Sequence, residues 1–147
     1  MLRIRRILYA TDLSRVSRRA FRTAVAFARA TRSHLVIVHV LSPLIPAVPP
    51  QTHEVVAQGQ HERVERRLAR LVAEARTAGV RASARLLEGV RMDEPIVQAA
   101  RAAHVDLIVM AADGPRGVGP VLLGSVAARV VATAPCPVLA VRGRSIV

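Results

Sequence analysis

The sequence predicts an α/β fold in which a single doubly wound, five-stranded parallel sheet occupies one domain, residues 1–147. Three observations predict it. Three runs of consecutive apolar residues resemble strands that are covered on both faces, helical patterns separate the strand candidates, and no repeat or long linker divides the chain. Strand therefore alternates with helix, which requires right-handed βαβ crossovers. The proline-rich segment 43–50 is expected to be a surface loop or lid.

Five segments are predicted as strands. The three apolar runs, which should lie in the centre of the sheet, are residues 7–10, 35–41 and 107–111. Residues 80–86 alternate apolar and polar side chains, so this strand should be peripheral, with one face or edge in water. Residues 138–141 follow two prolines, which cannot donate ladder hydrogen bonds, and are therefore expected at an edge.

The first predicted helix lies between the first two strands. Ser14 is a candidate N-cap, because its hydroxyl can accept a hydrogen bond from an unpaired N–H of the first turn. The apolar residues that should line its buried face are Val16, Ala20, Ala24 and Phe27. The spacing thus predicts one helix that covers the sheet.

Three further helices are predicted. The second carries an apolar stripe over residues 64–75 and should end at Gly79, where a left-handed residue often closes a helix. The third opens at Asp93 with Pro95 in its first turn, where proline is tolerated. The fourth is expected over residues 125–133.

The formal charge of +12 raises the possibility of a nucleic-acid partner, because basic residues gain binding energy by releasing counterions from phosphates. All 22 basic residues are arginines, but they are spread along the chain rather than clustered, and a coding bias toward arginine explains them more simply. Two Phe, one Tyr and no Trp leave little for bases to stack on. Specific nucleic-acid binding is therefore not expected.

The remaining composition argues for a cytoplasmic protein without a membrane helix. No apolar run approaches the roughly 20 residues that cross a bilayer. The single cysteine, Cys136, cannot pair within the chain, which fits a reducing compartment, and is expected to be a buried structural thiol. The five histidines do not fall at spacings that present a metal site.

A candidate binding site lies where loops follow the strands. In an open parallel sheet, ligands bind at the carboxyl ends of the strands where the winding reverses. Thr11 and Asp12 follow the first strand, and the glycine-rich residues 114–120 follow the fourth, shortly before Gly124 and Ser125. Glycine lets backbone N–H groups approach an anion, and a helix that begins at Ser125 favours phosphate. A flexible turn is the competing interpretation.

The order of motifs resembles the universal stress protein family. Residues 7–14 are similar to the first strand and loop of that family, and residues 122–126 and 134–139 are similar to its ending. Its ATP-binding members carry Gly-x-x-Gly, nine residues, then Gly-Ser or Gly-Thr. Here Gly114, nine residues and Gly124-Ser125 fit that register. The likeness covers essentially the whole chain and is weakest over residues 42–60.

The resemblance implies an adenine-nucleotide alpha hydrolase-like, Rossmann-like sheet with strand order 3-2-1-4-5. It also implies ATP or another adenine nucleotide as ligand. By position, the Ala10 backbone and Asp12 would meet the nucleoside, and Val40 would lie against the adenine. Met110 and Ala111 would flank the ribose. The winding would reverse between the first and fourth strands, where the two candidate loops meet.

The same resemblance assigns the phosphates to the glycine-rich loop. Gly114, Gly124, Ser125 and Val126 would donate from backbone and hydroxyl groups, with Mg²⁺ between phosphate oxygens. Asp113 precedes this loop, and a carboxylate about 5 Å from a phosphate costs roughly 3 kcal/mol at an effective dielectric near 20. Arg116, a bridging metal ion or an outward-pointing Asp113 side chain would each relieve this repulsion.

The predicted function is a stress-response module that binds ATP with Mg²⁺ and acts as a homodimeric regulator. The homodimer is implied by the family resemblance, in which the last strand pairs with its symmetry mate, and residues 138–141 are the matching edge. Ala111, which stands where the family motif has its first glycine, and Asp113 motivate an alternative, a protein-interaction scaffold of the same fold without nucleotide. A slow ATPase or autophosphorylating protein is a third hypothesis. Fast turnover is not expected, because the chain has no lysine to contact a γ-phosphate.

Overall fold

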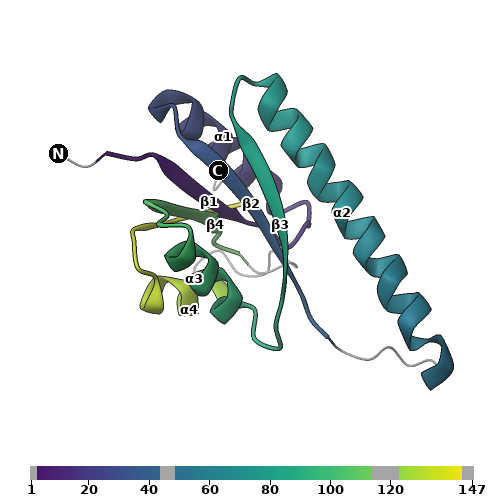
Figure 1. Ribbon diagram of the computed structural model, residues 1–147. Helices are drawn as coiled ribbons and strands as arrows, with labels where there is room; N and C mark the ends of the chain where they lie inside the picture. Colours follow the sequence, from purple (N-terminus) through teal and green to yellow (C-terminus); the bar gives the residue numbers. More distant parts are fainter. Residues whose placement is uncertain (1–2, 44–48, 114–122, 144–147) are drawn as a thin grey trace.

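The computed structural model describes residues 3–43, 49–113 and 123–143, and its centre is a parallel sheet (Figure 1). The strands are β1 (Arg6–Ala10), β2 (His34–Leu41), β3 (Ala82–Glu88), β4 (Leu107–Ala111) and β5 (Val138–Val141). Every pair of neighbours is parallel, and the order is β3-β2-β1-β4-β5. The predicted fold class and strand order are confirmed.

Helices cover both faces of this sheet (Figure 1). Their bounds are α1 (Arg18–Thr31), α2 (His53–Thr77), α3 (Asp93–Ala102) and α4 (Ser125–Thr133), with a short 3-10 helix η1 (Pro50–Thr52) before α2. α1 and α2 pack on one face, and α3 and α4 pack on the other. Within the described residues, no helix is both long enough and apolar enough to cross a membrane. The predicted loop over residues 43–50 lies partly outside the described residues.

The core forms two layers because successive side chains of each strand point to opposite faces. On β1, Ile7 and Tyr9 pack with α1 and α2, whereas Leu8 and Ala10 pack with α3 and α4. All four side chains are buried. The central position predicted for this strand is confirmed, and its carboxyl end borders both layers.

The two edge strands also agree with the sequence. β3 and β5 lie at opposite edges, and Arg85 of β3 is exposed. β3 begins at Ala82 rather than at Val80, which is buried just before the strand. All four residues of β5 are partly exposed, as expected for a strand that ends the sheet.

Two expectations for α1 were wrong. Its N-cap is Ser17, and Ser14 lies in the preceding turn, where its Oγ accepts a long 3.4 Å hydrogen bond from the Ser17 N–H. Phe27 is 41% exposed rather than buried. The buried residues of α1 are Ala20, Phe21, Ala24 and Ala28. Phe27 lies at the margin of that face. The seven residues from Ala20 to Phe27 turn an α-helix about 20° short of two full turns, and the other buried residues lie on the far side of Ala20.

Cys136 was expected to be buried and is only half-buried. It lies in the turn that leads into β5 at the sheet edge, where little covers it. Burial still raises the pKa of its thiol, and the nearby Asp106 carboxylate adds to that shift. The thiol therefore stays protonated at neutral pH.

Candidate functional site

A cavity of about 220 Å³ lies at the carboxyl ends of β1, β2 and β4, on the face that α3 and α4 cover. Eight residues of the predicted site line it: Ala10, Asp12, Val40, Met110, Ala111, Gly124, Ser125 and Val126. The remaining two, Gly114 and Arg116, lie outside the described residues. Because the winding reverses between β1 and β4, this cavity is at the switch point of the sheet. We call it the switch-point cavity.

Its walls are mainly apolar. Val40 and Met110 are buried at the ends of β2 and β4, and Ile96 of α3 is buried opposite them. Met92, just before α3, completes this side. Such a cavity fits a flat, weakly polar group such as a nucleobase, since small-molecule sites are mostly apolar with a few placed polar groups.

The loop after β1 supplies polar groups in a fixed conformation. The Thr11 Oγ1 accepts a hydrogen bond from the Leu13 N–H at 2.9 Å, and the Asp12 Oδ1 accepts one from the Ser14 N–H at 2.9 Å. Leu13 has a φ of 63°, a strained value for leucine that these bonds help to hold. The His39 Nδ1–H donates to the Thr11 carbonyl at 2.8 Å. The exposed Asp12 carboxylate is therefore oriented from its own loop.

The start of α4 forms the opposite end of the cavity. Gly124 is its N-cap and donates its own N–H to the Ala112 carbonyl at 2.6 Å. Gly124 has no side chain that could accept a hydrogen bond from the first turn, so the N–H groups of that turn lack a side-chain partner from their cap, and Ser125, Val126 and Ala127 line the cavity. These N–H groups and the helix dipole make this end favourable for an anion.

The two departures from the family motif have different consequences. Ala111 belongs to β4, and the residues with positive φ in the described ranges lie elsewhere, so alanine fits its backbone without strain. Asp113 lines the cavity, and its Oδ2 accepts a hydrogen bond from the Gly143 N–H at 2.8 Å. Its negative charge thus remains at the cavity, held by the chain beyond β5.

Several lining residues were missed by the sequence analysis. They are Ser17, Val38, His39, Met92, Ile96 and Ala127. A signal existed for Ile96, because a helix that follows a parallel strand starts at the carboxyl edge of the sheet, where ligands bind. Ser17 could not be found in this way, because its place depends on where α1 begins.

Fold and cavity define a doubly wound α/β protein with a cavity at the switch point of its sheet. Residues 3–142 match the family described as "Universal stress protein family", and the chain belongs to this family. It is 41% identical over 136 residues to the universal stress protein in the QAH/OAS sulfhydrylase 3' region of Thermus aquaticus. That match covers 92% of this chain and 97% of the relative.

Solved structures agree. The hypothetical protein MJ0577 superposes with a TM-score of 0.84 at 25% identity, and the match covers 97% of this chain and 99% of that one. A universal stress protein family protein from Arabidopsis thaliana, solved with AMP bound, has a TM-score of 0.71 at 21% identity. The match covers 97% of this chain and 93% of the plant protein. At that identity the likeness concerns the fold alone.

Proposed function

We propose that the chain binds ATP or another adenine nucleotide in the switch-point cavity and acts as a homodimeric, cytoplasmic regulator in a stress response. One observation carries the proposal. Residues assigned separately to adenine, ribose and phosphate, on β1, β2, β4 and α4, line one cavity. The AMP-bound plant protein of the same fold supports an adenine nucleotide as the ligand class.

The proposal gives each part of the cavity a role. The adenine packs against Val40, and the ribose lies by Met110 and the Asp12 carboxylate, which accepts hydrogen bonds from its hydroxyls. The phosphates lie at the start of α4, where Ser125 and Val126 contribute N–H donors. Each such charge-assisted bond contributes about 1.5–3 kcal/mol, and burial of the adenine against apolar side chains adds to the binding free energy.

The donor set fits Mg²⁺ only as part of a nucleotide complex. In the described residues, no group of three or more His, Cys, Asp or Glu side chains could hold a metal alone. Mg²⁺ commonly keeps several waters and uses one or two carboxylates plus phosphate oxygens. Asp12, whose carboxylate lines the cavity, is the residue that would help to hold it. The ion would neutralise phosphate charge beside Asp113.

Dimerisation through β5 is the second part of the proposal. β5 ends the sheet, and its four residues are partly exposed, so an identical strand can extend the ladder. Light scattering should give twice the mass of one chain. A monomer at micromolar concentration would reject the dimer without affecting the nucleotide proposal.

Calorimetry with nucleotide-stripped protein tests the binding site. Ser125→Asp puts a negative charge where the phosphates would lie, yet a carboxylate at the start of a helix favours folding. We expect it to weaken MgATP binding at least about tenfold. Ser125→Asn, which has nearly the same shape without the charge, should keep most of the affinity. Equal affinities of the two variants, or no heat from the unmodified chain at millimolar MgATP, would reject the proposal.

A second candidate function is a protein-interaction scaffold that holds no nucleotide. The Asp113 carboxylate favours it, because a fixed negative charge lines the cavity beside the phosphate end. The calorimetric titration separates the two functions, since the scaffold predicts no heat from any adenine nucleotide.

A further inference from the structure

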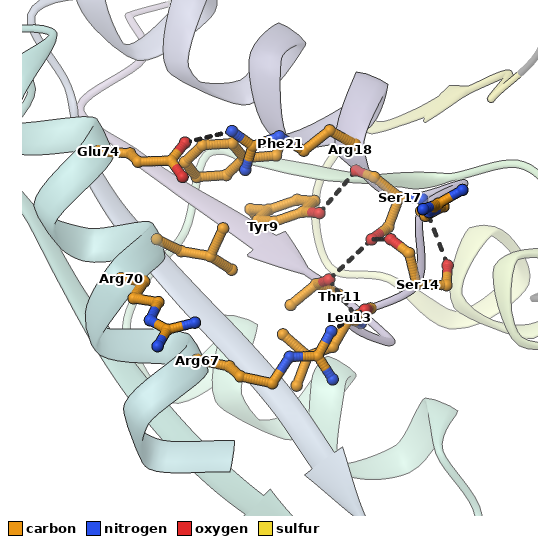
Figure 2. A pocket seen from close by; sticks show the side chains of 12 residues that line it. Tyr9, Thr11, Leu13, Ser14, Ser17, Arg18, Phe21, Arg67, Arg70 and Glu74 are labelled. Atoms are coloured by element: carbon orange, nitrogen blue, oxygen red, sulfur yellow. Dashed lines mark hydrogen bonds and ion pairs between the residues drawn. The ribbon is translucent and has the colours of Figure 1, made fainter. Parts of the chain in front are cut away.

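A second hollow lies on the opposite face of the sheet, between α1 and α2 (Figure 2). Its volume is about 420 Å³, within the range of about 300–1,000 Å³ that is typical of small-molecule sites. The sequence analysis did not predict it. We call it the α1–α2 hollow.

The charge of this hollow is strongly positive. Four arginines and one glutamate line it: Arg15, Arg18, Arg67, Arg70 and Glu74. This gives a formal excess of three positive charges. Figure 2 shows Arg67 and Arg70, from α2, on one side and the Arg18–Glu74 ion pair across the top.

The arginines differ in whether they already have a partner. Arg18 is paired with Glu74, and the Arg67 guanidinium donates to the Leu13 carbonyl. Among the described residues, Arg15 and Arg70 have no side-chain partner, although both line the hollow. Two guanidinium groups that line the hollow, one from the loop before α1 and one from α2, are therefore without a side-chain partner in the described part of the chain.

The polar groups at the floor of the α1–α2 hollow already have hydrogen-bond partners. The Tyr9 hydroxyl donates to the Ser17 carbonyl at 2.8 Å, and the Ser17 Oγ–H donates to the Ser14 carbonyl at 2.8 Å. In the 3.1 Å contact between the Thr11 and Ser17 hydroxyls, Thr11 is therefore the donor. Because these hydroxyl groups are already hydrogen-bonded, an occupant would have to gain its affinity from the arginines and from apolar contact.

Apolar surface is present beside the cations. Leu13, Phe21 and Leu71 line the hollow. The Arg18 guanidinium lies 5.3 Å from the centre of the Phe21 ring, which keeps that charge over an aromatic face. A bare inorganic anion would leave these groups unused, whereas an anion with a carbon skeleton would cover them.

We propose that the α1–α2 hollow is a second ligand site, which takes a small organic anion with a compact apolar body. The acidic group binds Arg70, and the apolar body packs against Leu13 and Leu71. This site does not depend on nucleotide binding in the switch-point cavity. The two cavities nevertheless share a wall, because Thr11 and Ser17 line both.

The probe for this site is 8-anilinonaphthalene-1-sulfonate, an aromatic monoanion whose fluorescence rises in apolar surroundings. It is titrated into the full chain with saturating MgATP present. Arg70→Glu should weaken its binding about fivefold to tenfold through loss of a charge-assisted hydrogen bond. Arg101→Glu is the matched control, because it makes the same charge change on α3, on the other face of the sheet. It should leave the affinity within about twofold.

The two variants decide the outcome. Weaker binding in Arg70→Glu alone supports the site, and millimolar inorganic phosphate should then fail to displace the probe. Equal affinities in all three proteins would place the probe elsewhere and overturn the proposal, as would an absence of saturable binding. Equal losses in both variants would overturn it too, since they would reflect net charge. Urea unfolding of each variant confirms that the fold is intact.

Discussion

The Asp113 carboxylate accepts a hydrogen bond from the Gly143 N–H at 2.8 Å, which joins the end of β4 to the residues after β5. The same carboxylate lines the switch-point cavity. Asp113 therefore stabilises the carboxyl edge of the sheet while it places a negative charge beside the proposed phosphates. These two effects can be separated by substitution.

Asp113→Asn should tighten MgATP binding by about tenfold, because it removes a nearby negative charge. The amide oxygen can still accept from Gly143, so the unfolding midpoint in urea should change little. Calorimetry measures the affinity. Weaker binding in this variant would mean that the carboxylate helps to hold Mg²⁺ rather than repelling phosphate.

Gly143→Ala should destabilise the fold by about 1–3 kcal/mol. A Cβ at this position would lie 2.8 Å from the Val16 carbonyl oxygen and closer still to the Val16 side chain, and the backbone oxygen cannot move aside. Gly59→Ala is the control, because a Cβ in α2 meets nothing within 4 Å and alanine favours a helix. Urea unfolding should show opposite signs for the two variants. A neutral Gly143→Ala would contradict the predicted clash.

Asp93→Asn should cost about 1–3 kcal/mol of unfolding free energy. Asp93 is 3% exposed at the start of α3, and it pairs with Arg91 at 3.0 Å and with Arg129 of α4 at 4.0 Å. Glu94→Gln removes a carboxylate from the same Arg91, but that side chain is 57% exposed. Its cost should stay below about 0.5 kcal/mol, because exposed ion pairs contribute little. Equal losses would show that burial does not decide the effect.

The His34 imidazole should make the fold less stable in acid. Burial lowers the pKa of His34, and the positive charges of Arg81, Arg6 and Arg76 lower it further. The folded state thus takes up its proton at lower pH than the unfolded state does. The neutral imidazole contributes fully to the free energy of unfolding above the unfolded-state pKa of about 6.5, and this contribution is lost as the pH falls below that value.

His34→Gln tests this pH dependence, because glutamine does not titrate and can still bond to the Ser83 hydroxyl, which lies 2.8 Å from the His34 Nε2. Urea midpoints between about pH 7.5 and pH 5.5 should fall less steeply for the variant than for the unmodified chain. Parallel curves would assign the acid sensitivity to other groups.

The strands could be predicted because their signal is local. The runs that became β1, β2 and β4 are apolar at nearly every position, and burial on both faces favours such a composition. The start of α1 could not be predicted, because Ser14 and Ser17 are both good N-cap residues and tertiary packing selects between them. Phe27 is exposed for the same reason, since the angle of α1 on the sheet sets its buried face.

The switch-point cavity was predictable, because the rule for open parallel sheets and the family resemblance together placed Asp12, Gly124 and Ser125 at one edge of the sheet. The α1–α2 hollow was not. It depends on where α2, which is mostly exposed on its outer side, stands relative to α1, and Arg67 and Arg70 resemble any other arginine of a solvated helix. Side chains that meet across two helices have no fixed spacing in the sequence, so no sequence pattern predicts that they meet.

Tyr9 is the single tyrosine of a chain without tryptophan, and its hydroxyl is bound to the Ser17 carbonyl in the wall between the two cavities. Burial raises the pKa of this phenol, so it stays protonated across the neutral range. The ultraviolet emission of the protein therefore originates from one ring at a known place. Tyr9 lines the α1–α2 hollow, so this ring is a built-in optical reporter for a ligand that binds there, without an added label.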